Sequence, residues 1–454
     1  MSHKLIVANR GEIACRVIRA AKALGIPTVA VYSEADAGAP HTQMADEAVA
    51  IGPAPAAQSY LRQDVLIEVA RSTGATLLHP GYGFLAENAG FAQRCADAGI
   101  RFVGPSPAVI TAMGDKEQAR RIAVEAGVPV SPGTPKLEAG GSDASVLAQA
   151  EAVGYPVLVK AAAGGGGIGM RRVDGPEGLV EAVATTRSLA ERAFGDGSVY
   201  LEHFIRRARH IEVQVFGFGN GRAVHLMDRD CSVQRRHQKV IEEALSPALD
   251  DATRAGITGV AVRLAEACRY EGAGTVEFLY DEENGRYFFL EMNTRIQVEH
   301  PVTEMVTGID LVAAQLRQAM GEDLTTELAQ SRISATGWAV EARLYAERPK
   351  KNFIPSPGPL NVLTVPQGEG LRIDTGYREG MKVTPHYDPM LMKIIAHGND
   401  RTQALARLDG ALASLVVEGI ETNRDFLRQV IAHPDFVAGK AHTTWLGDNL
   451  SSLI

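Results

Sequence analysis

The chain has 454 residues, 45% of them hydrophobic, and its 46 lysines and arginines against 54 aspartates and glutamates give a net charge of −8. This length predicts about three domains, and the negative charge argues against general binding to nucleic acid or to an anionic membrane surface. The four cysteines form no C-x-x-C pair, so we expect neither a zinc site nor a disulfide framework. The N-terminus lacks the apolar stretch of a signal peptide, and no segment approaches the ~20 apolar residues of a membrane span. We therefore expect a cytoplasmic protein.

The N-terminal part alternates apolar strands with amphipathic helices. Strands are expected at residues 5–8 and 28–32, with a helix over 13–24 between them, and further strands at 75–79 and 101–104. A repeated strand, helix, strand order is typical of a doubly wound parallel sheet. We therefore predict a Rossmann-like domain over residues 1–114.

The middle of the chain reads as a second α/β unit that carries a small α+β lid. A helix over 116–126 leads into a segment rich in proline and glycine, which marks a boundary. Strands at 156–160 and 170–173 then enclose a glycine-rich loop, and a helix over 176–191 follows. We expect this unit to span residues 115–334 and its lid to span about 131–204.

Strands with a period of two dominate beyond residue 200. His210, Glu212 and Gln214 alternate with apolar neighbours, and Asn220-Gly221 is a turn signal. A helix over 252–270 precedes a hairpin of strands 274–280 and 287–292. We expect a third unit over residues 335–448, with a closing helix near 402–416.

The glycine run at residues 164–169 follows the strand that ends in Lys160. Bare backbone N–H groups there could wrap a polyphosphate, with the lysine ammonium neutralising its charge. The run also fits G-x-G-x-x-G, and a glycine run is often a flexible turn. A returning strand follows it instead of the helix that a dinucleotide site requires, and the chain has no Walker A string. The context therefore favours a nucleotide-binding flap.

Two glutamates interrupt the apolar strands of the predicted hairpin. If Glu283-Asn284-Gly285 forms the loop, Glu277 pairs with Glu291. Opposed like charges destabilise a bare sheet, and a divalent cation is a reason to keep them there. The alternative is a solvated strand face with two unrelated acids. The pattern favours a magnesium site, to which Asn293 adds a neutral oxygen.

The run from Arg295 to Pro301 alternates polar with apolar residues, so Arg295, Gln297 and Glu299 are expected to point the same way. Guanidinium, amide and carboxylate groups suit a small planar oxyanion such as bicarbonate, with Glu299 placed to take its proton. A surface strand with a salt bridge is the competing interpretation. The donor-rich stretch 228–239 is either a basic surface patch or the polar wall of a cleft.

These strings resemble those of biotin carboxylases. EMNTRIQVEHPVTE at residues 291–304 is similar to the signature of that family, and three further strings agree: ANRGEIA at 8–14, HPGYGFL at 79–85, and RDCS with QRRHQK within 229–239. The resemblance extends almost end to end. It implies an ATP-grasp fold with an N-terminal pre-ATP-grasp domain, a mobile lid and a C-terminal biotin carboxylase domain.

The resemblance also implies roles for individual residues. Contacts to ATP are implied for Lys116, Lys160, Gly165, Gly166, Gly167, Glu202, His210, Gln234, His237 and Glu277. Magnesium or manganese ligands are implied at Glu277, Glu291 and Asn293, and bicarbonate or biotin contacts at Arg295, Gln297, Val298, Glu299, Arg343 and Tyr82. In this scheme bicarbonate attacks the γ-phosphate to give carboxyphosphate, Glu299 acts as the base, Lys239 stabilises the developing charge and Arg343 steadies the biotin enolate. Arg295 belongs to the same catalytic group.

Two departures from the family pattern stand out. Ile168 occupies a position in the glycine loop where relatives commonly carry Arg or Lys, so we expect altered lid closure or nucleotide affinity without loss of activity. Ala342 and Tyr345 also differ from familiar members. Lys382, in Met381-Lys382-Val383, lacks the second methionine of a biotinylation site, so biotin is expected on a separate carrier protein.

Two other functions compete with this interpretation. An ATP-grasp carboxylate–amine ligase would share Lys160, Glu277 and Glu291, and a nucleotide-binding regulator would bind ATP without turnover. Neither explains the run from Arg295 to Glu299. The family resemblance implies a homodimer that works with a carrier protein and a carboxyltransferase, with acetyl-CoA as the leading acceptor.

Overall fold

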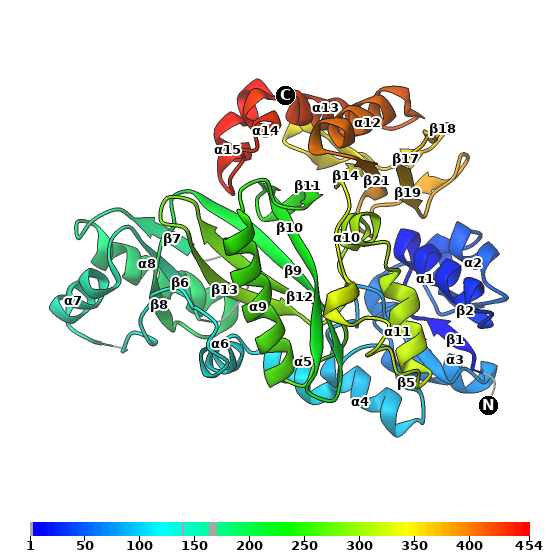
Figure 1. The fold of residues 1–454 in the computed structure, drawn as a ribbon, viewed down its shortest axis with the longest axis horizontal. Coiled ribbons are helices and arrows are strands. Elements are labelled where there is room, and N and C mark those ends of the chain that lie inside the picture. The colour runs from blue at the N-terminus through cyan, green and yellow to red at the C-terminus, as the bar shows by residue number, and fades with distance from the viewer. Residues whose placement is uncertain (1–2, 139, 163–169) are drawn as a thin grey trace.

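The computed structural model describes residues 3–138, 140–162 and 170–454 (Figure 1). Its N-terminal unit is the predicted parallel sheet, with strand order β3-β2-β1-β4-β5. Leu5 and Val7 of the first strand pack against helix residues on one face of the sheet, and Ile6 packs into a second core on the other. Helices therefore cover both faces, as is usual for a parallel sheet. The elements are β1 (Leu5–Val7), α1 (Gly11–Ala23), β2 (Thr28–Tyr32), α2 (Pro40–Met44), β3 (Glu47–Ala50), α3 (Gln63–Thr73), β4 (Leu77–His79), α4 (Ala89–Asp97), β5 (Arg101–Phe102) and α5 (Pro107–Gly114).

The lid extends to the left of the molecule in Figure 1 and has a hydrophobic core of its own. Its antiparallel sheet has the order β7-β6-β8. Val157 and Val159 lie on the buried face of the middle strand, where they pack with both lid helices. The elements are α6 (Lys116–Glu125), which precedes the lid, then α7 (Asp143–Val153), β6 (Val157–Ala161), β7 (Met170–Val173), α8 (Leu179–Phe194) and β8 (Val199–His203).

An antiparallel sheet with the order β13-β12-β9-β10-β11-β14-β21-β19 forms the centre of the described chain. Its strands are β9 (Ala208–Phe218), β10 (Ala223–Arg235), β11 (Gln238–Ala244), β12 (Glu271–Asp281), β13 (Arg286–Asn293), β14 (Trp338–Tyr345), β19 (Leu371–Thr375) and β21 (Met390–Gly398). β11 pairs directly with β14. The regions on either side of residue 334 therefore share one sheet.

Helices cover this sheet along its length. α9 packs its Ile257 and Val260 against β9, and α12 packs Leu408 and Leu412 against β14 and β21. The other helices and short strands are α10 (His300–Thr307), α11 (Leu311–Ala319), β15 (Glu347–Arg348), β16 (Ile354–Pro355), β17 (Gly358–Pro359), β18 (Val362–Thr364), β20 (Lys382–Val383), β22 (Val416–Glu418), α13 (Arg424–Ala432), α14 (Pro434–Val437) and α15 (Trp445–Asn449); α9 spans Asp251–Ala267 and α12 spans Arg401–Ser414. None of the helices in the described residues is long and apolar enough to cross a membrane.

The surface strand that the sequence left open as the competing interpretation of the run from Arg295 is not present. Residues 295–299 form a turn that leads into α10, not an alternating strand. The carbonyl of Gln297 accepts hydrogen bonds from the backbone N–H of His300 at 3.3 Å and from its ring Nδ1 at 2.7 Å. Pro301 then occupies the first turn of the helix, where its missing N–H costs nothing. The alternation in the sequence therefore reflects this helix start.

Candidate active site

Three neighbouring strands carry a row of glutamates on one face of the central sheet. Glu277 on β12 pairs with Glu212 on β9 and with Glu291 on β13. Glu212 and Glu277 are buried, whereas Glu291 is exposed. Like charges placed side by side on a sheet repel each other, so such a row requires cations close by.

Lys239 on β11 is the cation at the centre of this row. Its ammonium contacts Glu212 and lies 3.1 Å from Oε1 of Glu277 and 2.8 Å from Oε1 of Glu299. Burial alone would lower the pKa of Lys239, but the three carboxylates raise it well above its usual value. The same ammonium, despite the burial of Glu277, holds the pKa of that carboxyl well below its usual range. All of these groups are therefore charged at neutral pH.

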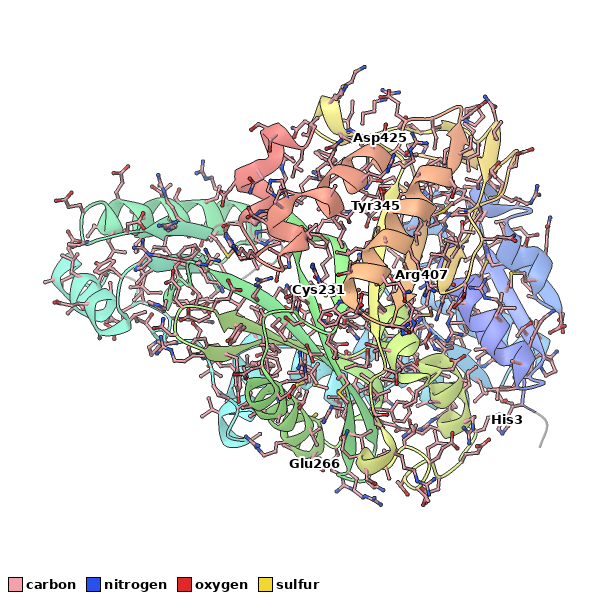
Figure 2. The ribbon with its side chains drawn as sticks, turned by 45° about the horizontal axis from the view of Figure 1, so that its top comes forward. His3, Cys231, Glu266, Tyr345, Arg407 and Asp425 are labelled. Atoms are coloured by element: carbon pink, nitrogen blue, oxygen red, sulfur yellow. The ribbon has the colours of Figure 1, made fainter. Side chains whose placement is uncertain are left out.

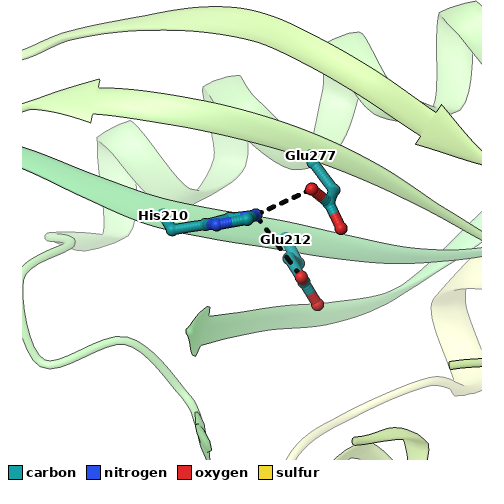
Figure 3. A group of neighbouring side chains, drawn as sticks. All are labelled: His210, Glu212 and Glu277. Carbon is teal, nitrogen blue, oxygen red and sulfur yellow. Dashed lines mark hydrogen bonds and ion pairs between the residues drawn. The ribbon is translucent and has the colours of Figure 1, made fainter. Parts of the chain in front are cut away.

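His210 lies between two of the buried acids, as Figure 3 shows. Its Nε2 is 2.8 Å from Glu277 and 3.5 Å from Glu212, and the side-chain amide of Gln234 lies 2.6 Å from its Nδ1. Burial would lower the pKa of His210, but Glu277 outweighs it and the pKa is raised. The three residues form an ion-pair cluster, and they also lie close enough together to hold a cation.

The predicted metal ligands lie together, but their atoms are partly occupied. Glu277 accepts hydrogen bonds from the amides of Asn293 at 2.8 Å and Gln297 at 2.9 Å. The Asn293 oxygen in turn accepts from Arg295 at 2.9 Å. Desolvation and repulsion from Glu277 both raise the pKa of Glu291. A divalent cation between the two opposed carboxylates would relieve that repulsion, so the donor set fits a metal that prefers oxygen ligands.

Glu299 joins Lys239 to Arg343 on β14. The second carboxylate oxygen of Glu299 lies 2.9 Å from Nη2 of Arg343. The Glu299 side chain is only 2% exposed. Burial would raise the pKa of Glu299, but Lys239 and Arg343 outweigh this effect and lower it. A deprotonated carboxylate held between two cations is a suitable proton acceptor for an anion bound beside them.

Arg295 and Tyr82 connect the site to the N-terminal unit. Nε of Arg295 donates to Glu87 at 3.0 Å. The Tyr82 hydroxyl donates to Glu12 of α1, which also lies 3.2 Å from the ammonium of Lys393. That ammonium donates to the carbonyl of Val298 at 2.7 Å. The turn at residues 295–299 therefore contacts Glu87 of the N-terminal unit and Lys393 of β21, and Lys393 connects it to Glu12 of α1.

The predicted nucleotide contacts are spread over the lid and the sheet. Lys160 on β6 forms an ion pair of 2.5 Å with Glu202 on β8. Lys116 begins α6, and the exposed His237 occupies the turn between β10 and β11 with a φ of +66°. The predicted contacts at Gly165, Gly166 and Gly167, like the substitution at Ile168, lie outside the described residues.

The sequence interpretation missed two buried members of the site, Arg229 and Glu212. Arg229 is 0% exposed and donates to Glu212, Gln214 and Gln297, which makes it the cation behind the acidic row. Both residues carried a signal. Glu212 lies on the polar side of an alternating strand, and Arg229 belongs to the donor-rich stretch 228–239, which proves to be largely a buried wall, with Arg236 and His237 exposed at its tip. Cys231 of this wall lies near the middle of the molecule in Figure 2.

Comparison with known families covers nearly the whole chain. Three family models match: "Biotin carboxylase, N-terminal domain" at residues 1–110, "Carbamoyl-phosphate synthase L chain, ATP binding domain" at 115–327 and "Biotin carboxylase C-terminal domain" at 341–448. Biotin carboxylase 1 of Bacillus subtilis is 49% identical over 446 residues, which are 98% of each chain. The mitochondrial methylcrotonoyl-CoA carboxylase subunit alpha of Mus musculus is 48% identical over 99% of this chain and 62% of its own length.

Solved structures agree with these matches. The biotin carboxylase domain dimer of Hydrogenobacter thermophilus 2-oxoglutarate carboxylase, in complex with MgADP, ADP and bicarbonate, has a TM-score of 0.91 at 43% identity and covers 99% of this chain and 98% of its own. The similarity extends through the ATP-binding and C-terminal regions that supply Glu277, Glu299 and Arg343. The chain therefore belongs to the biotin carboxylase family of ATP-grasp ligases, and its activity is that of the biotin carboxylase component of a biotin-dependent carboxylase.

Proposed function

We propose that this chain carboxylates biotin on a separate carrier protein through carboxyphosphate, using MgATP and bicarbonate. The observation that carries the proposal is the contact of Glu299 with both Lys239 and Arg343. An anion bound beside those cations meets a deprotonated carboxylate that can take its proton. Arg295, Gln297 and the backbone of Val298, which lie in the same turn, would hold bicarbonate there.

The first chemical step joins bicarbonate to the γ-phosphate of ATP. A bicarbonate oxygen forms a bond to phosphorus while the bond to ADP breaks, and Glu299 receives the bicarbonate proton. Lys239 stabilises the charge that develops on the transferring group, because its position is already fixed by three carboxylates. The biotin carboxylase dimer that resembles this chain holds both MgADP and bicarbonate, which supports this pairing of substrates.

ATP would lie between the lid and the acidic row. We assign its contacts to the residues implied by the resemblance, namely Lys116, Lys160, Gly165, Gly166, Gly167, Glu202, His210, Gln234, His237 and Glu277. Magnesium or manganese, held by Glu277, Glu291 and Asn293, would neutralise the phosphate charge when bound. The repulsion between Glu277 and Glu291 supports this assignment.

Biotin would lie on the side of Arg343 and Tyr82. The guanidinium of Arg343 would steady the negative charge of the biotin ureido group after its nitrogen loses a proton. Carboxyphosphate supplies the carboxyl group: a bond forms between its carbon and the biotin nitrogen, the bond from that carbon to the phosphate oxygen breaks, and the phosphate that leaves takes up the proton of the nitrogen. We propose a division into units 1–114, 115–334 and 335–448, and a cytoplasmic homodimer that works with a biotin carrier protein and a carboxyltransferase.

Free biotin allows a direct test. The purified chain is incubated with MgATP, labelled bicarbonate and biotin, and carboxybiotin is measured by its label. We expect label in carboxybiotin and ADP release that requires both bicarbonate and biotin for its full rate. ADP release that depends on an amine would instead support a carboxylate–amine ligase and overturn the proposal.

A further inference from the structure

Glu242 on β11 is a buried carboxyl that no assigned step uses. A β-bulge between Lys239 and Ile241 shifts the alternation of this strand relative to β10. Because a bulge re-aims the side chains beyond it, Lys239 and Glu242, three residues apart, both reach the cluster around Glu299. Glu242 is 0% exposed, so its charge must have a partner inside the protein.

That partner is Arg343. A single guanidinium nitrogen, Nη2, lies 2.5 Å from Glu242 and 2.9 Å from Glu299. Among the described residues, neither oxygen of Glu242 accepts a hydrogen bond. The ion pair with Arg343 is therefore the main interaction that compensates the buried charge of Glu242.

A second carboxyl, Glu341 on β14, stands directly opposite Glu242 and is equally buried. It has no hydrogen-bond partner in the described part of the chain either. Burial, only partly offset by Lys393, raises the pKa of Glu341 well above its usual value, which favours its neutral form. Glu242 is the member of the opposed pair that touches Arg343, so it is the better placed of the two to carry a negative charge.

The two carboxylates that contact Arg343, Glu242 and Glu299, differ in whether they keep their negative charge during the reaction. Under the proposed function, Glu299 is protonated when it takes the bicarbonate proton, and a neutral acid holds a guanidinium weakly. Lys239 keeps two other anions at that moment, Glu212 and Glu277. In the described residues, Arg343 keeps only Glu242 as a carboxylate partner.

We propose that Glu242 is a positioning residue for carboxyl transfer to biotin: it holds the Arg343 guanidinium in place while Glu299 carries the proton. The inference rests on the proposed function, because it needs Glu299 to be the base. It assigns Glu242 no contact with substrate. Its role is confined to the biotin half of the reaction.

The test compares two isosteric substitutions in the wild-type full chain. Glu242→Gln removes the charge that anchors Arg343, so we expect kcat for carboxybiotin formation to fall by about tenfold or more, as is typical when a reacting group loses its position. Bicarbonate-dependent ADP release without biotin should change less than about twofold, because Lys239 and Glu299 stay in place. Glu341→Gln is the matched control and should leave both rates unchanged, since the carboxylates that touch Arg343 in the described part of the chain are Glu242 and Glu299.

The pH profile provides a readout that a structural defect would not move. The groups that face Glu242 are Lys239 from its own strand, Arg343 and Glu341 from β14, Cys231 from β10, and Glu299 from the turn before α10. Burial, opposed by Arg343, raises the pKa of Glu242 to about 7. Carboxybiotin formation by the wild type should therefore fall as the pH drops through this value, and the profile of Glu242→Gln should lack that step.

Equal losses of ADP release and carboxybiotin formation in Glu242→Gln would overturn the inference, because they would indicate general damage to the site. So would a wild-type kcat in this variant while Arg343→Ala is inactive. If the wild-type chain forms no carboxybiotin at all, the proposed function fails first, and this inference fails with it.

Discussion

Glu277 on β12 lies directly opposite Glu291 on β13, and this pairing depends on a bulge in the hairpin. Phe278 pairs with Phe289, so a regular ladder would place Leu290 opposite Glu277. The bulge skips Leu290 and brings the two acids together instead. The opposition of these like charges is therefore built into the strand geometry, which is what a cation site between them requires.

Glu291→Gln should raise the magnesium concentration that gives half-maximal ADP release. It removes a carboxylate facing Glu277, and since even indirect partners of a metal contribute 10-fold or more, we expect an increase of at least about tenfold. Titration of free Mg²⁺ at saturating ATP measures it. If His210→Asn shifts the magnesium requirement and Glu291→Gln does not, the cation binds instead in the cluster of His210, Glu212 and Glu277.

The pairing of Glu277 with Glu291 could be predicted from the sequence, although its basis was only partly right. The expected loop was residues 283–285, but the turn spans 282–285 between Asp281 and Arg286, and the bulge makes up the difference. The parallel sheet, the lid strands and the turn at Asn220-Gly221 followed from periodicity and turn residues.

The buried charge network could not be predicted in the same way. Arg229 meets Gln297 across 68 residues of sequence, and no local pattern encodes such a contact. The run from Arg295 to Glu299 has the alternation of a strand but folds as a turn, because α10 begins at His300 and the chain leaves the sheet before it. Long-range ion pairs and bulges decide where these side chains point.

Glu299→Gln should abolish the coupling between bicarbonate and ATP hydrolysis. An amide cannot accept the bicarbonate proton, so we expect bicarbonate-dependent ADP release to fall about 10²- to 10⁴-fold. ATP binding, measured by calorimetry, should be retained, because Glu299 is assigned no nucleotide contact. Glu283→Gln, at an exposed turn position, serves as the control. A rate within about tenfold of wild type would remove Glu299 from the role of base.

Lys239→Met should destabilise the fold as well as stop catalysis. It leaves Glu212, Glu277 and Glu299 without their common cation, and breaking a buried ion pair typically costs about 3–5 kcal/mol. Lys239 lowers the pKa of Glu277 and Glu299, so its contribution is present above their unfolded pKa and lost on acidification.

Denaturant unfolding should therefore show a larger loss for Lys239→Met at about pH 7, above the unfolded pKa of glutamate, than at about pH 3, below it. Lys4→Met is the control, since the ion pair of Lys4 with Glu47 is partly exposed and should contribute less than about 1 kcal/mol. An equal loss at both pH values would show that the lysine stem, not its charge, stabilises the site.

Glu242→Gln should have the opposite effect on stability. The pKa of Glu242 is raised to about 7 by burial, so the native state binds its proton more tightly than the unfolded chain does. The stability that this proton provides is complete below the unfolded pKa and is lost as the pH rises through the native value. Above about pH 7 the wild type must keep a buried anion next to Glu341, whereas the amide carries no charge.

We therefore expect Glu242→Gln to unfold at a higher denaturant concentration than the wild type at about pH 8, with a gain of about 1–3 kcal/mol, and to match it at about pH 5. Glu341→Gln should show a smaller difference, because burial raises the pKa of Glu341 well above its usual value and favours its neutral form. A variant less stable than the wild type at about pH 8 would mean that the ion pair with Arg343 outweighs the burial of the charge. A gain in stability together with a loss of carboxybiotin formation would show that the charge of Glu242 serves catalysis and lowers the stability of the folded protein.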